Sequence, residues 1–182
     1  MISLEETEFI AQLLDPQTQN EAFGRLMKLY RRPLYHHIRS MVIDHDDADD
    51  ALQNTFVKVF QHLKGFKGES KLFSWMYRIA TNEAITLINQ RAKRGRISSE
   101  DWYAKKIENL RADAHFDGDA VQLKLQQAIA TLPQKQRLVF NMRYFEEIKY
   151  EAMSEILGTS VGALKASYHH AAKKIEDYMN KH

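Results

Sequence analysis

The sequence predicts an all-α protein of two small helical bundles joined by a linker. Apolar residues recur at helical spacing through most of the 182 residues. Helix-capping residues precede several of these periodic stretches. Only seven glycines and three prolines occur, which is few for the many turns of a β-rich fold. The apolar period weakens once, over residues 97–118, so we expect domains at 1–96 and 119–182 with a linker between them.

Two helices are predicted to open the first domain. Ser3 and Glu6 form a capping-box pattern ahead of the first helix, which the Asp15-Pro16 pair should end. The second helix is expected over residues 20–43, with Pro33 as a candidate kink site. Its inward face is predicted to carry Ala22, Phe23, Leu26, Leu29, Tyr30, Leu34, Ile38 and Met41.

Two further helices should complete the first domain. Asp44 is a suitable cap for the third, over residues 47–63, and Ser70 for a long fourth. Phe56 and Phe60 are among the residues expected inside the third helix, and Phe73 inside the fourth. The fourth helix ends in a basic cluster, residues 91–96, which the negative end of a helix favours in any case.

The segment 97–118 is interpreted as an inter-domain linker with a helical turn. It holds three basic and five acidic residues, a net of 3 − 5 = −2, and its apolar spacing is irregular. The segment also contains Trp102, Tyr103 and Ile107, so it is not expected to be wholly unstructured.

Helical spacing resumes after Asp119. One helix should bury Val121, Leu125, Ile129 and Leu132, and Pro133 should start the next, which buries Leu138, Val139, Met142 and Phe145. A helix-turn-helix is then predicted: Gly158 supplies a left-handed turn and Ser160 caps the second helix. An ordinary helical hairpin in an all-α core fits the same spacing.

Composition narrows the class of protein. There is no cysteine, which excludes disulfides and thiolate metal sites, and no run of about 18 apolar residues that could span a membrane. We expect a cytoplasmic protein without direct membrane insertion. Phosphate-binding glycine loops, nucleophile elbows and His-Glu-x-x-His patterns are missing from the sequence, so we expect no enzyme, no cofactor and no metal site. The net charge of +2 does not by itself indicate a nucleic-acid-binding protein.

Charged and aromatic residues concentrate in the third and fourth helices. The third starts with five aspartates and continues with polar Gln53 and Asn54. Stabilisation of acidic residues by the helix dipole explains the aspartates in part. The functional interpretation is that this polar face docks a basic partner. Near the fourth helix, Trp75 and Tyr77 lie close to lysines 64, 67 and 71, as single-stranded DNA binding requires. Both aromatics cannot share the inward face of Phe73, so at least one is expected to be functional; core packing is the alternative.

These motifs resemble bacterial sigma factors. The region-two domain of that family is similar to residues 46–60 (DDADDALQNTFVKVF), 66–70 (FKGES) and 73–82 (FSWMYRIATN). The region-four domain is similar to residues 132–174, beginning LPQKQR. The order of the motifs and the length between them resemble the extracytoplasmic-function (ECF) class, which consists of these two domains.

The resemblance implies a subunit that binds core RNA polymerase, directs it to promoter DNA and helps to melt the −10 element. Core-polymerase binding is then expected of Asp49, Asp50, Gln53, Asn54 and Phe56. Capture of −10 single-stranded DNA is expected of Phe66, Lys67, Trp75, Tyr77, Arg78 and Asn82. Contact with −35 duplex DNA is expected of Ser160, Lys165, Ala166, His169, His170 and Lys173. Family habit also implies an anti-sigma factor as a partner.

The predicted recognition helix departs from the family pattern. It reads LKASYHHAA over 164–172, and Ser167, His170 and Ala172 stand where arginine is common. Bidentate readout of guanine by arginine is not available at these positions, so the −35 preference of relatives does not transfer. His169 and His170 are adjacent and project about 100° apart, so they cannot chelate one ion from one helix face.

Two other classes of protein fit parts of the sequence. A dimeric helix-turn-helix regulator explains residues 150–175 but not the acidic third helix or the aromatic loop. An all-α protein-interaction module without DNA binding fits the low net charge.

Overall fold

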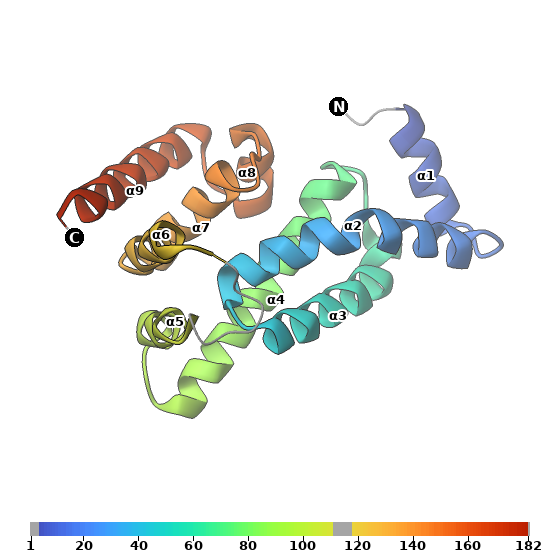
Figure 1. Cartoon of the computed structure of the whole chain (residues 1–182). Coiled ribbons are helices and arrows are strands. Elements are labelled where there is room, and N and C mark those ends of the chain that lie inside the picture. The colour runs from blue at the N-terminus through green and yellow to red at the C-terminus, as the bar shows by residue number, and fades with distance from the viewer. Residues whose placement is uncertain (1–3, 111–117, 182) are drawn as a thin grey trace.

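The computed structural model describes residues 4–110 and 118–181, and every regular element in these ranges is helical (Figure 1). The elements of the front bundle are α1 (Leu4–Leu14), α2 (Gln19–Val42), α3 (His45–His62), the 3₁₀ turn η1 (Leu63–Gly65) and α4 (Leu72–Gly95). They are followed by α5 (Ser99–Glu108) and by the rear bundle of α6 (Ala120–Ala130), α7 (Gln134–Tyr144), α8 (Tyr150–Leu157) and α9 (Val161–Lys181). The all-α, two-bundle prediction is confirmed.

Two helices, α3 and α9, start at the predicted caps. The Asp44 carboxylate accepts the backbone N–H of Asp47 at 3.1 Å, and the Ser160 hydroxyl accepts that of Ala163 at 3.3 Å. Gly158 ends α8 in the left-handed conformation, with φ of 63°. The helix assignment of α2 is continuous through Pro33. These starts and stops depend on contacts within a few residues, which is why they follow from sequence.

One cap comes from another helix. Ser70 was expected to cap α4, and this prediction is wrong: the N-cap position is Lys71, without a side-chain cap. The carboxylate of Glu6 in α1 instead accepts the backbone N–H of Leu72 at 2.7 Å. Ser3, the other half of the predicted capping box, lies outside the described residues. Glu6 therefore joins α1 to the start of α4, a partnership that local spacing cannot reveal.

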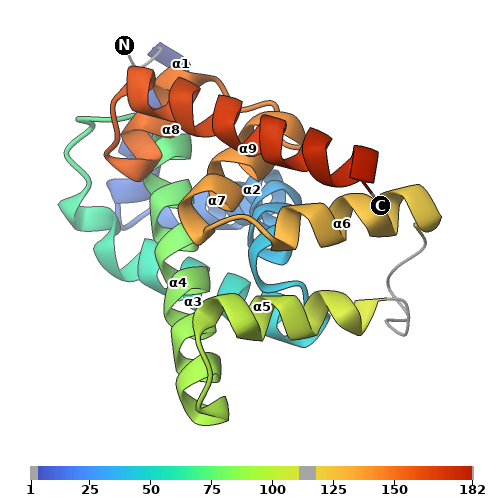
Figure 2. The same cartoon turned by 90° about the vertical axis from the view of Figure 1, so that its left-hand side faces the viewer.

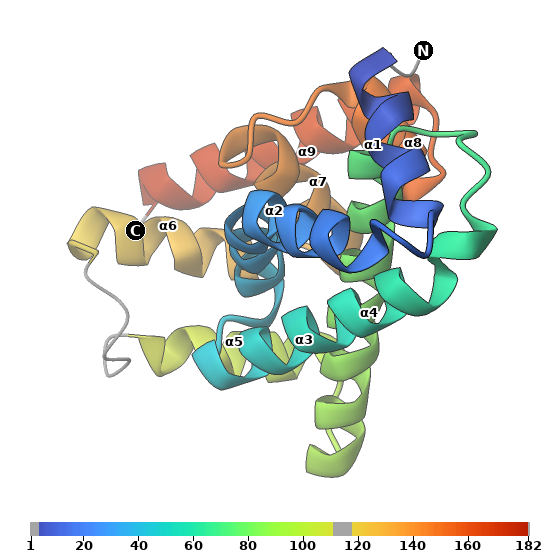
Figure 3. The same ribbon diagram turned by 90° about the vertical axis from the view of Figure 1, so that its right-hand side faces the viewer.

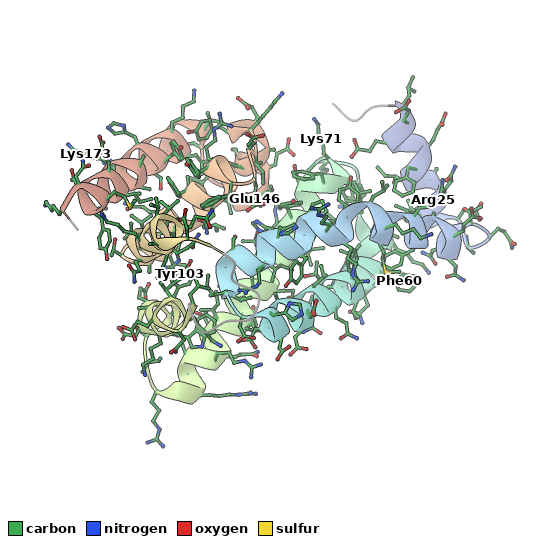
Figure 4. The ribbon with its side chains drawn as sticks, viewed as in Figure 1. Arg25, Phe60, Lys71, Tyr103, Glu146 and Lys173 are labelled. Carbon is green, nitrogen blue, oxygen red and sulfur yellow. The ribbon has the colours of Figure 1, made fainter. Side chains whose placement is uncertain are left out.

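Four residues predicted to face inward are exposed instead. They are Leu29 in α2, Phe60 in α3, Val121 in α6 and Phe145 after α7. At these places, the part of the helix surface that packs against neighbouring helices is narrower than the apolar face that the sequence indicates. Phe60 still packs its ring edge-on against Phe23, with centroids 5.1 Å apart, and it projects outward from α3 (Figure 4).

The predicted linker contains a packed helix. Trp102, Tyr103 and Ile107 of α5 are buried against the bundles, and α5 contacts both α4 and α6 (Figure 2). A helical turn was expected in this segment, and Ser99–Glu108 form a helix of 10 residues instead. Residues 111–117 of the linker lie outside the described part of the chain. Independence of the predicted domains stays a prediction.

The two bundles pack directly on each other. α2 contacts α7 and α4 contacts α8, and a single cluster of buried apolar residues runs from the front bundle into the rear one. Figure 3 shows α7 behind α2, on the side of α2 away from α3. A smaller cluster holds the rear bundle together through Ala128, Ile129, Leu132, Phe140, Ala171 and Ile175.

The glycine turn of the helix-turn-helix can be tested by a pair of substitutions. Across the described part of the chain, no neighbouring atom lies within 4 Å of the position that a Cβ would take at Gly158 or Gly162, so only the backbone conformation distinguishes them. Gly158→Ala should lower the free energy of unfolding by about 1 kcal/mol because its φ is positive. Gly162→Ala, inside α9, should raise it by about 0.5 kcal/mol. Urea unfolding followed by circular dichroism measures both, and equal effects would contradict the assigned turn.

Candidate nucleic-acid and protein-binding surfaces

The aspartates at the start of α3 have two different roles. Asp47 is buried and accepts two hydrogen bonds from the Arg91 guanidinium of α4, at 2.6 and 3.0 Å. This bond to Asp47 raises the pKa of Arg91. Burial alone would raise the pKa of Asp44, but the hydrogen bond from Lys106 at 2.9 Å and that from Asp47 N–H outweigh burial and lower it. Both carboxylates therefore hold the fold together.

The predicted docking residues occupy the outer face of α3. Asp49, Asp50, Gln53 and Asn54 are exposed, and only Phe56 is buried. Phe56 lines an open groove of about 530 Å³ between α2 and α3, together with Gly24, Met27, Lys28, Arg31, Asp49, Leu52 and Gln53. A second hollow of about 260 Å³, between α3 and α4, includes Asp50, Gln53, Asn54, Arg91 and Arg94.

The same face has an apolar part that sequence reasoning missed. Val57 is 48% exposed and Phe60 is 44% exposed, and they follow the polar residues along α3. Helical periodicity had assigned Phe60 to the core. The exposed face of α3 thus changes from acidic to apolar along the helix, which suits a protein partner with a basic and an apolar part.

The loop after η1 brings together aromatic and basic side chains. Phe66 and the half-buried Trp75 pack with ring centroids 5.0 Å apart. Phe66 itself is largely buried, so Trp75 presents more of the surface of this pair. Lys67 is exposed beside it, as are Lys64 and Lys71, which lies at the outer end of α4 (Figure 4). The loop therefore offers an aromatic surface with cations around it.

Tyr77 belongs to the core in this structure. It is 3% exposed, and its ring lies 4.2 Å from that of Phe73 and 4.9 Å from that of His37. Burial, and after it the charge of Glu146, raise the pKa of the Tyr77 phenol. A side chain enclosed in this way has no face for an unpaired base, so we remove Tyr77 from the DNA-contacting set.

Arg78 and Asn82 face the rear bundle. Both are exposed, yet the Arg78 guanidinium donates to the backbone carbonyl of Glu155 in α8. Asn82 lines a groove of about 280 Å³ between α4 and the rear bundle, whose other residues include Ile85, Lys135, Leu157, Thr159 and Ser167. The predicted −10 residues are thus divided between the aromatic loop and an inter-bundle groove.

The predicted recognition helix buries one face in the core and exposes the opposite face. Leu164, Ala171 and Ile175 of α9 are buried, and the opposite face exposes Lys165, Ala166, His169, His170 and Lys173. Ser160 is exposed at the helix start, where it caps α9. Lys173 points away from the rest of the molecule (Figure 4).

Polar contacts across the bundle interface had no signal in the sequence. His37 of α2 is fully buried; its Nε2 lies 2.8 Å from the Thr81 hydroxyl and its Nδ1 3.0 Å from the Glu146 carboxylate. Glu146 lies between the two bundles, in the turn after α7 (Figure 4). His37 does fall on the inward face of α2, three residues after Leu34, but nothing local indicates its partner.

A second joint links α5 and α7 to α2. The carbonyl of Ser40 accepts from the Asn141 amide at 3.3 Å and from the Tyr103 hydroxyl at 3.5 Å. The guanidinium of Arg137 lies 3.6 Å from the centre of the Tyr103 ring, a close cation–π contact. Burial lowers the pKa of Arg137 and raises that of Tyr103 to about 12. These side chains tie the rear bundle and α5 to the end of α2.

Comparison with known proteins matches both bundles to one family. Residues 26–94 match the model for sigma-70 region 2, and residues 122–175 match that for sigma-70, region 4. The ECF RNA polymerase sigma-E factor of Haemophilus influenzae is 25% identical over 171 residues, covering 88% of this chain and 89% of that protein.

Two solved structures share the fold. CnrH, in complex with the cytosolic domain of CnrY, aligns with a TM-score of 0.69 at 21% identity, covering 96% of this chain and 97% of CnrH. The sigma factor RpoE in complex with the anti-sigma factor NepR, from Bartonella quintana, aligns with a TM-score of 0.65 at 19% identity, covering 87% of this chain and 97% of that one.

The chain belongs to the sigma-70 family of RNA polymerase sigma factors. With a region 2 and a region 4 and a curated ECF relative aligned over most of both lengths, it is a member of the ECF class. It is therefore a non-enzymatic transcription initiation factor with DNA-binding sigma domains. Across the described residues, no helix has the length and apolar character needed to cross a bilayer.

The division of the α3 aspartates can be tested by comparing two isosteric substitutions. Asp47→Asn removes the charge that Arg91 binds and should lower the free energy of unfolding by about 1.5–3 kcal/mol, the range for hydrogen bonds to charged groups. Asp50→Asn, on the exposed face, should change it by less than about 0.5 kcal/mol. Urea unfolding measures both, and a larger loss for Asp50→Asn would contradict the assignment.

Proposed function

We propose that this ECF sigma factor binds core RNA polymerase through α3, captures an unpaired −10 strand with the η1–α4 loop and α4, and holds −35 duplex DNA with α9. The observation that carries the proposal is that the residues expected for polymerase and for duplex DNA lie on separate exposed faces of region 2 and region 4. Promoter-specific initiation by a sigma factor needs simultaneous contact with polymerase and DNA, which separate faces allow.

The chemistry of α3 supports polymerase docking. Asp49, Asp50, Gln53 and Asn54 offer acceptors and charge for a basic partner helix. Val57 and Phe60 extend this face with apolar surface that would be desolvated on docking. We therefore add both to the proposed docking set, while Phe56 acts from below by shaping the groove between α2 and α3.

The aromatic loop supports capture of a −10 base. Trp75, backed by Phe66, provides a stacking surface, and Lys67 provides charge for a phosphate. The Asn82 amide can pair with a base edge, and Arg78 can bind the phosphate backbone once it leaves the Glu155 carbonyl. Unstacking a base costs a few kcal/mol, which stacking on Trp75 and pairing with Asn82 would help to offset when the −10 element melts.

The side chains of α9 support binding to the −35 element that is weaker than binding through arginine and that reads the bases through other side chains. Lys165 and Lys173 can contact phosphates, and His169 and His170 can donate to base edges. Because arginine is missing from the face, we expect base preference to come from the histidines and from DNA shape.

An anti-sigma factor is the expected regulatory partner. Its support is the structural likeness to RpoE, which was solved with the anti-sigma factor NepR. The exposed apolar residues of α3 and the groove between α2 and α3 are surfaces that such a partner can cover.

The docking face predicts a loss of polymerase binding on charge reversal. Asp50→Arg combined with Gln53→Ala should weaken co-purification with core RNA polymerase at least about tenfold, since like charges now oppose each other. Glu176→Arg on the exposed side of α9 is the matched control and should bind core as the unsubstituted chain does. Full binding by the double variant would place the docking face elsewhere.

The proposed contact between Asn82 and an unpaired base predicts a defect in promoter opening alone. Asn82→Ala should reduce runoff transcription from a duplex promoter about tenfold or more, through loss of a bidentate contact, and leave core binding intact. A promoter already unpaired at the −10 element should restore most of the activity. Asn180→Ala, an exposed asparagine near the end of α9, is the control. Unchanged runoff from the duplex promoter would rule out this role for Asn82.

A further inference from the structure

The start of α4 carries the proposed base-stacking side chain and receives its cap from another helix. The N-cap position is Lys71, whose side chain makes no cap hydrogen bond. The backbone N–H of Leu72, the first residue of α4, donates at 2.7 Å to the carboxylate of Glu6 in α1. These two residues are 66 positions apart in the chain. The packing of α1, and not the sequence around α4, therefore provides the acceptor for this N–H.

Trp75 lies in the helical turn that this contact holds. Its backbone N–H donates to the carbonyl of Lys71 at 3.0 Å, which closes the first turn of α4. The N–H groups of the first turn have no acceptor inside the helix, so this turn frays unless a side chain caps it. The Trp75 ring packs against Phe66 with centroids 5.0 Å apart, and fraying of the turn would move the two rings apart. The position of the stacking surface therefore depends on the order of this turn.

The loop before α4 is anchored at both of its ends. Residues 66–71 connect η1 to α4 without regular structure. At the start of the loop, the N–H of Phe66 donates to the carbonyl of Leu63 at 3.0 Å, and the Leu63 side chain is fully buried. At its end, the Leu72 side chain is buried and its N–H is bound by Glu6. Glu6 thus supplies the hydrogen bond that fixes the point where the loop enters α4.

The carboxylate of Glu6 suits this role in its charge and in its support. Negative charge is stabilised at the N-terminal end of a helix, where the helix dipole is positive. α1 contacts both α2 and η1, with Leu13 fully buried and Phe9 and Ile10 half-buried. Burial raises the pKa of the Tyr30 phenol in α2, and the nearby charge of Glu6 raises it further. Glu6 therefore lies where α1, α2 and the start of α4 meet.

We propose that Glu6 is a positioning residue for capture of the −10 base: by capping α4 from α1, it fixes the turn that carries Trp75. Glu6 acts through Trp75 and does not itself contact DNA. A purely structural role, in which Glu6 only fastens α1 to the bundle, would leave the loop unchanged when Glu6 is replaced. The effect on DNA binding rests on the proposed function, whereas the effect on the order of Trp75 does not.

The order of Trp75 can be measured by its own fluorescence. The chain has two tryptophans, so Trp102→Phe leaves Trp75 as the single one. In that background, Glu6→Met keeps a side chain of similar length without the acceptor, and acrylamide quenching of Trp75 should rise about twofold as the first turn frays. Glu6→Gln retains an oxygen acceptor and should give an intermediate value. Glu8→Met, the same change at an exposed position of α1, should leave quenching unchanged.

The effect on function is measured with the full chain reconstituted with core polymerase. The probe is forked DNA with an unpaired −10 strand, taken from a promoter that the parent holoenzyme transcribes. Glu6→Met should bind this DNA about fivefold more weakly than Glu8→Met, the factor expected for loss of one helix cap. Both variants should bind core polymerase equally. If circular dichroism shows that Glu6→Met has lost helix content, the milder Glu6→Gln takes its place in the comparison.

A cap supplied locally separates the positioning of α4 from the attachment of α1. Lys71 has the extended backbone of an N-cap residue, with φ of −61° and ψ of 144°. Lys71→Ser therefore offers a hydroxyl to the N–H groups of the first turn. Combined with Glu6→Met, it should return the quenching of Trp75 to the parent value and restore most of the lost DNA affinity. The effect of Lys71→Ser alone is measured in the parent and divided out.

The outcomes distinguish the cap from a purely structural contact. Equal DNA binding by Glu6→Met and Glu8→Met would overturn the proposal, and so would a loss that Lys71→Ser does not recover, since attachment of α1 alone predicts no recovery. If the parent holoenzyme did not bind the forked DNA, the proposed function would fall. A rise in Trp75 quenching that Lys71→Ser reverses would still support the cap in that case.

Discussion

The burial of the middle of α7 on all sides is the constraint on which the arrangement of the bundles depends. Six consecutive residues of this helix, 137–142, are buried, including the polar Arg137 and Asn141. A helix enclosed on every side needs neighbours on every side. Phe140 packs into the rear cluster, while Leu138, Val139 and Met142 join the cluster that continues into the front bundle. The rear bundle alone cannot cover α7, so contact with α2 completes its burial.

Because α7 is enclosed, its polar side chains are buried in the same interface and need interaction partners there. Arg137 finds the Tyr103 ring, and Asn141 finds the Ser40 carbonyl. The turn that follows α7 carries Glu146 to His37. Each of these contacts gives a buried polar group a partner, and leaving such a group without one costs about 1–3 kcal/mol. The Oδ1 atom of Asn141 has no hydrogen-bond partner among the described residues. The interface is therefore stabilised by its apolar part and made specific by its polar pairs.

The sequence predicted correctly the features that depend on contacts within a few residues, and it missed those that depend on contacts between helices distant in the chain. Asp44, Gly158 and Ser160 act within their own turns and were predicted correctly. The start of α4 was assigned to Ser70, because spacing along the chain cannot show that Glu6 of another helix reaches Leu72. α5 was underestimated because irregular apolar spacing hides a helix that is buried between two partners.

The sequence by itself determined the all-α class and most polar surface residues, because helical period and capping are local properties. The order of the two sigma regions came from the resemblance of the motifs to that family. Only the tertiary structure decided that Tyr77 is core, that Phe60 is exposed on the outer face of α3, and that Arg78 and Asn82 lie under region 4. Which side of an amphipathic helix meets water depends on what packs against it. That choice is made by helices distant in the chain, and by the need of each buried charge for a counter-charge.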